Sequence, residues 1–167
     1  MTKNHTRGEA SRLTSEQIDA LRPGIAQIKL IFVALVSGVV LFGVVAVVFG
    51  GPLELVLPPD MLSLILLGIS LVTGVQGLVA PGIIRSAASR KLTPVMTVTR
   101  LAGIWNSSTL VGIALLESAA FLNLVGIFME SNVIHLVVAG LFFALMFVHY
   151  PGTNRILDWI DRTASQR

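Results

Sequence analysis

Glu117 is the residue whose type and position most clearly indicate chemistry. It is the only ionisable residue in the apolar stretch 109–128. Because an ionised carboxylate is costly in hydrocarbon, we expect this acid to be protonated at rest. A neutral acid that releases its proton when a cation or water arrives is what a proton or sodium carrier requires. A Glu117 that only donates a hydrogen bond to a neighbouring helix is the alternative, and the sequence leaves both open.

Two serines on other apolar stretches are the candidate partners of Glu117. A helical rise of about 1.5 Å per residue places Ser37 and Ser70 near the depth of Glu117, if each stretch crosses the membrane. No Lys or Arg lies at that depth, so the acid has no counter-ion in its own chain. We therefore predict a proton- or ion-binding group that consists of Glu117, Ser37 and Ser70.

Other polar side chains in the apolar stretches are predicted to make interhelical hydrogen bonds, which are a common means of helix association in membranes. Gln76, Asn106 and Ser107 lie at one level, near the inner membrane surface. We expect them to bond between the second and third stretches. Asn123 adds a further polar contact to the third.

No residue pattern predicts a metal site, a cofactor or an enzyme. His135 and His149 stand at opposite ends of one apolar stretch, roughly 20 Å apart along a helix, and the chain has no cysteine. Gly50 and Gly51 indicate a turn, because no nucleotide-binding glycine spacing surrounds them. No serine, histidine and acid fall at a common depth, as a hydrolase would need. We expect no metal, no cofactor and no enzymatic activity.

The segment from Thr109 to Phe128, TLVGIALLESAAFLNLVGIF, resembles the carboxylate-bearing helix of the proteolipid c subunit of rotary ATP synthases. The shared features are a glycine, a few aliphatic residues, a glutamate and then alanine before a Leu-Val run. The resemblance implies that Glu117 is an ion-binding acid. It covers this segment alone, because the chain has neither a helix with glycine at every second position nor an Arg-Gln-Pro type loop.

Four membrane-spanning helices must position these residues. Hydrophobic residues make up 54% of the chain, charged residues make up 13%, and the mean hydropathy is +0.83, which is too apolar for an ordinary soluble domain. Each of four apolar stretches is about long enough to cross a hydrocarbon core roughly 30 Å thick. These stretches are residues 27–49, 61–84, 104–129 and 133–150.

The basic residues predict which helix ends face the cytoplasm. All twelve Lys and Arg lie in three segments, which are residues 3–29, 85–100 and 155–167. The two remaining loops, residues 50–60 and 130–132, carry only acidic charges. Because cytoplasmic loops are enriched in Lys and Arg, we predict that both termini and the middle loop are cytoplasmic.

The segments outside the spans are predicted to form short helices. Thr14 and Gln17 make a capping-box pattern, and Pro23 is expected to stop the helix that begins there. Residues 1–26 would then be a cytoplasmic segment with a short interfacial helix. Residues 151–167 alternate apolar and charged side chains, which predicts a cytoplasmic amphipathic tail on the membrane surface or, alternatively, a docking helix for a partner.

Prolines and small residues predict helix ends and packing. Pro81 is expected to end or bend the second helix, and Thr93 followed by Pro94 is expected to begin the third. The short connections predict two antiparallel hairpins. In the third span, small residues at helical spacing are expected to face the bundle together with Glu117. They are Gly103, Ser107, Ala114 and Ser118.

These patterns together predict an all-α four-helix bundle, residues 27–150, in the plasma membrane of a bacterium. The function that we expect is that of a small accessory or scaffold component. The alternative is a proton- or sodium-coupled carrier, or a proteolipid-like subunit, that works through Glu117. The expected partners are the lipid bilayer and either further copies of the chain or another membrane protein, with no nucleic acid.

Overall fold

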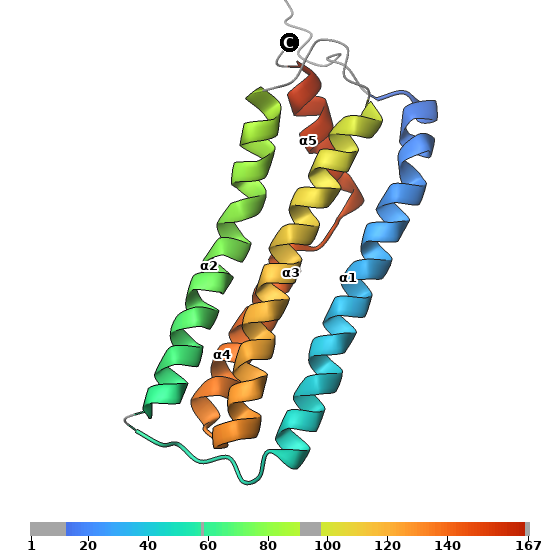
Figure 1. The fold of residues 1–167 in the computed structure, drawn as a ribbon. Helices are drawn as coiled ribbons and strands as arrows, with labels where there is room; N and C mark the ends of the chain where they lie inside the picture. The colour runs from blue at the N-terminus through green and yellow to red at the C-terminus, as the bar shows by residue number, and fades with distance from the viewer. Residues whose placement is uncertain (1–12, 58, 91–97, 166–167) are drawn as a thin grey trace, which may run out of the picture.

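The computed structural model describes residues 13–57, 59–90 and 98–165, and this part of the chain is helical. Its elements follow one another along the chain as α1 (Ser15–Phe49), α2 (Met61–Arg90), α3 (Val98–Glu130), α4 (Val133–Met146), the short 3₁₀ turn η1 (Phe147–His149) and α5 (Thr153–Ser165). Figure 1 shows long helices running side by side, with α5 at the same end of the bundle as the beginning of α1. We call this end of the bundle the terminal end and the other the opposite end. The predicted all-α class is confirmed for the described residues.

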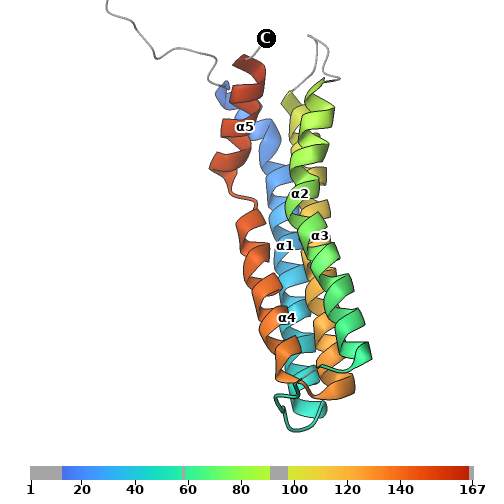
Figure 2. The same ribbon diagram turned by 90° about the vertical axis from the view of Figure 1, so that its left-hand side faces the viewer.

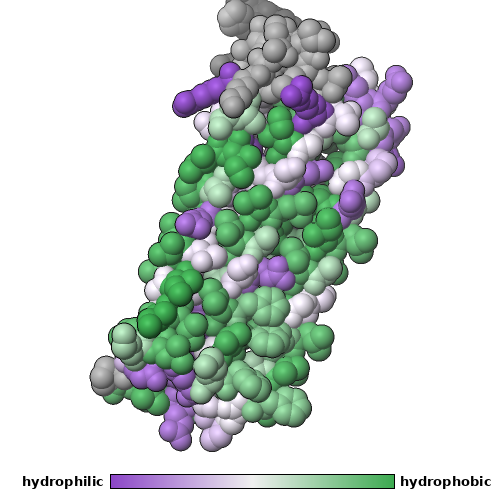
Figure 3. Space-filling model, viewed as in Figure 1, coloured by the Kyte–Doolittle hydropathy of each residue, from purple (hydrophilic) through white to green (hydrophobic). Residues whose placement is uncertain are grey.

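Three helices, α1, α2 and α3, are long and apolar enough to cross a membrane. The segment made of α4, η1 and α5 is a fourth candidate span, and it bends by 56° between His149 and Thr153. Figure 3 shows apolar side chains covering much of the visible face between two more polar ends. The chain is therefore a helical membrane protein with three or four spans.

Helix α3 lies at the centre of the arrangement. It packs against α1, α2 and α4, whereas α1 and α2 make no substantial contact with each other. Figure 1 shows α3 between them. The expected hairpin of spans one and two is thus not a packed pair, although α3 and α4 do form a packed antiparallel hairpin. The connection 50–60 is long enough to pass the α3–α4 turn, where Glu54 accepts a hydrogen bond from Val133 N (3.0 Å).

The prolines do not end the helices as the sequence analysis expected. Thr14 caps α1 with the predicted capping box, but α1 continues through Pro23 to Phe49. Likewise α2 continues through Pro81 to Arg90. Pro81 is buried against α3, and a Cβ atom added to Gly112 would lie 2.5 Å from its Cγ atom. The packing of Pro81 on α3 compensates for the one backbone hydrogen bond that a proline removes, whereas Pro23 is exposed and lies in the first part of α1. The predicted start of the third helix at Thr93 and Pro94 lies outside the described residues.

The small residues of α2 and α3 pack differently from each other. Ser70 and Gly74 are buried, and Gly74 lies against the ring of Phe142 from α4. The stripe of small residues on α3 was expected to face the bundle, and this is wrong, because the stripe is exposed. Its members are Gly103, Ser107, Ala114 and Ser118. The helix turns a different face inward, with Gly112 and Leu116 against Gly77 of α2.

Helix α5 packs its apolar face on protein, which the sequence analysis did not expect. Ile156 and Ile160 are fully buried in a cluster with Leu21 of α1 and with Leu101 and Trp105 of α3. Figure 2 shows α5 continuing from α4 along the terminal end of the bundle. The amphipathic pattern was recognised correctly, and the apolar face of α5 packs on the first part of α1 and the beginning of α3.

Candidate functional site

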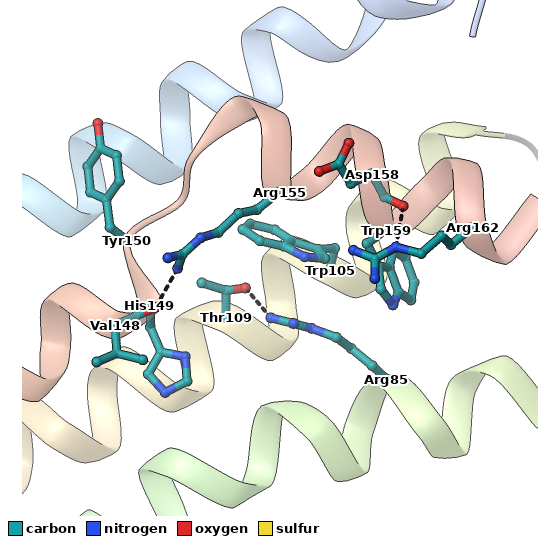
Figure 4. Close-up of a pocket in the computed structure, with 10 residues that line it drawn as sticks. All are labelled: Arg85, Trp105, Thr109, Val148, His149, Tyr150, Arg155, Asp158, Trp159 and Arg162. Atoms are coloured by element: carbon teal, nitrogen blue, oxygen red, sulfur yellow. Dashed lines mark hydrogen bonds between the residues drawn. The ribbon is translucent and has the colours of Figure 1, made fainter. Parts of the chain in front are cut away.

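A cavity at the terminal end gathers three arginines and two tryptophans from different helices (Figure 4). Its volume is about 250 Å³, and we call it the arginine pocket. It lies where α2, α3 and the bend between α4 and α5 meet. The side chains that line it are Arg85, Trp105, Thr109, Val148, His149, Tyr150, Arg155, Asp158, Trp159 and Arg162.

Arg85 reaches from α2 into this pocket and is held there by α3. Its Nε atom donates to Ser108 Oγ (2.8 Å) and its Nη2 atom donates to Thr109 Oγ1 (2.7 Å). The guanidinium carbon lies 5.0 Å from the ring centroid of Trp105, which is a cation–π distance. Two hydroxyl groups and an aromatic ring therefore set the position of the Arg85 guanidinium group. Its remaining N–H groups can donate to a ligand in the pocket.

The other two arginines come from α5 and are held by backbone carbonyl groups. Arg155 Nη1 donates to the carbonyl oxygen of Val148 (2.6 Å), and Arg162 Nε donates to that of Asp158 (3.1 Å). Within the described residues, no guanidinium group of the three forms an ion pair with a carboxylate. Three positive charges thus surround one cavity, where Asp158 is the acidic residue in the lining.

Sequence reasoning missed this pocket, although α5 carries a signal for it. Arg155, Asp158, Trp159 and Arg162 follow one another at helical spacing and lie on one side of α5. The sequence analysis used these arginines and Arg85 only to orient the chain in the membrane. Nothing local indicates that Arg85, some seventy residues before Arg155, would meet them.

Glu117 lies about midway along α3, and the structure places it beside α1. Its Oε1 atom would be 3.8 Å from a Cβ atom added to Gly38. Ser37 is exposed on α1, and Ser70 donates its hydroxyl hydrogen to Leu67 of its own helix (2.9 Å). Neither serine is hydrogen-bonded to Glu117, and the carboxyl group has no hydrogen-bond or ion-pair partner within the described part of the chain.

The polar residues expected between the second and third spans are also spread apart. Gln76 is exposed on α2, and Ser107 is exposed on α3. Asn106 lies beside Gly24 of α1, with its Nδ2 atom 3.5 Å from where a Cβ atom would be. Among these four residues, within the described part of the chain, Asn123 alone makes an interhelical hydrogen bond, since its Oδ1 atom lies 3.1 Å from His135 Nδ1 of α4.

A buried polar network at the opposite end contains the serine, histidine and acid that the sequence analysis did not find at a common depth. Ser63 Oγ lies 3.0 Å from His135 Nε2 and donates to Glu130 Oε2. Glu130 Oε2 is also 3.6 Å from His135 Nε2. His135, Ser63 and Asn123 are 0 to 1% exposed, so the network lies inside the bundle. The network therefore fastens α2 to the α3–α4 hairpin.

Asp60 fixes the start of α2 next to this network. Its Oδ1 atom accepts from the backbone N–H of Ser63 (2.8 Å). This backbone hydrogen bond lowers the pKa of Asp60, and a side-chain hydrogen bond with Glu130 lowers it further, against an opposing effect of burial. The aspartate acts as an N-cap of α2, where a negative charge is favoured.

Within the described residues, no three His, Cys, Asp or Glu side chains are arranged to hold a metal ion. The arginine pocket is therefore the site whose chemistry is most specific, since its guanidinium groups suit an anion. Comparison of the chain with protein-family models, with curated proteins and with solved structures finds no match.

Proposed function

We propose that this chain is a small scaffold or accessory protein of the plasma membrane, and that it binds another membrane-spanning helix along α3. The observation that carries the proposal is Glu117, a carboxyl group near the middle of a membrane-spanning helix with no partner among the described residues. A charged side chain at the bilayer centre costs about 2.5–3.5 kcal/mol on insertion scales, and such residues usually face other protein. A partner helix would supply the hydrogen-bond partner that Glu117 lacks among the described residues of this chain.

The exposed stripe of small residues on α3 supports this docking face. Lipid gives no hydrophobic driving force between helices, so close approach over small residues and interhelical hydrogen bonds drive their association. Because α1 and α2 are not packed together, the face of α3 between them stays open (Figure 1). Ala114 and Ser118 lie on this face close to Glu117, and both are exposed.

A second copy of the chain is the partner that these residues fit most simply. Two copies related by an axis along the membrane normal place their Glu117 side chains at the same depth. Ser118 donates its hydrogen to Ala114 O of its own helix (2.8 Å), so its hydroxyl oxygen remains able to accept. A protonated Glu117 of one copy can then donate to Ser118 or Glu117 of the other.

Single-cysteine cross-linking in membranes tests the interface directly, because the natural chain contains no cysteine. Ala114→Cys should form disulfide-linked dimers under mild oxidation. Leu71→Cys, on the exposed side of α2, is the matched control and should stay monomeric. The added substitution Glu117→Gln should keep the cross-link, since the amide still donates, whereas Glu117→Leu should weaken it. Equal cross-linking at positions 114 and 71, or none at 114, would rule out this face.

The orientation that we propose puts the terminal end in the cytoplasm. Arg22, Lys29, Arg85, Arg155 and Arg162 lie at this end, which supports the positive-inside assignment. Thr99→Cys should react with a membrane-impermeant maleimide only after cells are opened, and Leu55→Cys should react in intact cells. Labelling in the reverse order would invert the proposed orientation.

Ion coupling through Glu117 is the second candidate, favoured by the partial exposure of its unpaired carboxyl group. The same position is what the resemblance to a proteolipid c subunit implies for an ion-binding acid. A hydrophobic carbodiimide should then modify the protonated form of Glu117, and bound sodium ions should slow the reaction if sodium is the coupling ion. In a scaffold, sodium should give no protection. Glu117→Gln is the control for labelling at this position.

A further inference from the structure

We propose that the arginine pocket binds a phosphate group, carried either by a lipid headgroup or by a soluble phosphoanion. Arg85, Arg155 and Arg162 converge on the cavity from two helices that are far apart in the chain (Figure 4). Guanidinium groups present planar forks of N–H donors that match two phosphate oxygens at once. This inference is independent of the interface that we propose on α3.

Donor atoms remain available on each of the three arginines. A guanidinium group has five N–H donors, of which Arg85 uses two for the α3 hydroxyls and Arg155 and Arg162 use one each for backbone carbonyls. These bonds hold the side chains in place without neutralising them. Since no described carboxylate forms an ion pair with any of the three, an anion would find charge and donors already positioned.

The buried edge of the cavity carries a further polar atom. His149 Nε2 is buried and has no hydrogen-bond partner within the described ranges. A buried polar nitrogen without a partner is unfavourable, and a ligand or a water molecule in the pocket removes this cost. The pocket therefore has polar groups for a ligand on more than one wall.

A second hollow extends the pocket along α2 and α5. Its volume is about 440 Å³, and it shares Arg85, Trp159 and Arg162 with the first. Hydroxyl groups from Ser86, Ser89 and Thr163 line it. A phosphate bound by the arginines of the pocket would have room on this side for a polar substituent such as glycerol.

The depth of the pocket suits a lipid phosphate. Arg85 lies about 36 Å along α2 from Met61, at about 1.5 Å per residue, which is beyond a hydrocarbon core roughly 30 Å thick. Trp105 and Trp159 flank the pocket, and indole rings favour this level of a membrane. At this depth, the opening of the arginine pocket lies level with the phosphate groups of the lipids.

Thermal unfolding of the full chain in detergent, with defined additions, tests the proposal. Phosphatidylglycerol should raise the melting temperature, and neutral diacylglycerol should not. Arg162→Gln and Arg155→Gln should each weaken the apparent affinity about tenfold, because each removes charge-assisted hydrogen bonds to the anion. Both side chains are exposed, so these variants should fold. Arg100→Gln, an exposed arginine outside the pocket, is the matched control and should bind as the natural chain does.

Inorganic phosphate and glycerol phosphate distinguish the two sources. If they raise the melting temperature and compete with the lipid, the site takes soluble phosphoanions; if phosphatidylglycerol alone acts, the ligand is a lipid headgroup. Either result supports a phosphate site, provided that Arg155→Gln and Arg162→Gln weaken it. A response that Arg100→Gln reduces equally, or no response to any of the three phosphates, would overturn the proposal.

Discussion

His135 Nδ1 of α4 lies 3.1 Å from Asn123 Oδ1 of α3, and both side chains are fully buried. Asn123 Nδ2 donates to Ala119 O (2.8 Å), which turns the amide oxygen toward the imidazole ring. An amide oxygen only accepts, so Nδ1 carries the proton. The other nitrogen, Nε2, faces Ser63, whose single hydroxyl hydrogen is directed to Glu130.

Replacement of Asn123 or His135 should destabilise the bundle. Asn123→Leu leaves the Nδ1–H group of His135 buried without an acceptor, at a cost of about 1–3 kcal/mol in the free energy of unfolding. His135→Leu should cost a similar amount, and the double variant should cost less than the sum, because the two residues form one contact. Denaturant titration in detergent measures all three. Ser118→Ala is the control, and strictly additive effects would contradict the contact.

Gly112→Ala should weaken the packing of α2 on α3. A Cβ atom at this position would lie 2.5 Å from Cγ of Pro81 and 2.9 Å from the carbonyl oxygen of Gly77. Both atoms belong to rigid groups, so we expect a loss of about 1–3 kcal/mol in unfolding free energy. The matched control is Gly68→Ala on α2, where no atom lies within 4 Å and the stability should not fall. A Gly112→Ala protein as stable as the control would show that α2 and α3 are not in close contact here.

Acid should weaken the start of α2 through Asp60. The pKa of Asp60 is lowered in the folded chain from its ordinary value of 3.8, so the folded state favours the ionised form. The contribution of Asp60 to stability is therefore complete above pH 3.8. It is lost as the pH falls through the lowered pKa that Asp60 has in the folded state. Hydrogen exchange of the Ser63 and Leu64 amides against pH measures this loss. Asp60→Asn keeps an N-cap residue but should remove this component of the pH dependence, and an unchanged profile would contradict the assignment.

Ile156→Asp should release α5 from the bundle. Ile156 is fully buried against α1 and α3. An unpaired carboxylate at this position costs on the order of several kcal/mol in free energy. Detachment of α5 from the bundle exposes the carboxylate to water and removes this cost. Trypsin should then cleave after Arg155 and Arg162 faster than in the natural chain. Asn154→Asp, an exposed substitution two residues earlier, should leave the cleavage rate unchanged. Equal rates in the two variants would mean that α5 is not held by its apolar face.

The sequence by itself determined the class and the elements of this protein. Long apolar stretches predicted the helices that became α1, α2 and α3, and Thr14 with Gln17 predicted where α1 begins. These are local properties, since helix length against bilayer thickness and the capping of a helix end depend on neighbouring residues only. The amphipathic pattern of residues 151–167 was also predicted from the sequence, but the sequence did not predict that α1 and α3 cover its apolar face.

The tertiary structure alone decided which faces meet. Ser63 and His135 are 72 residues apart, and Arg85 meets Trp105 because α2 packs along α3, with Pro81 against Gly112. The same contacts decided that the small residues of α3 point outward and that Pro81 lies within a helix. In lipid, apolar helices gain little from hydrophobicity alone, so their arrangement follows from shape and hydrogen bonding between distant segments, which the order of residues along one helix does not encode.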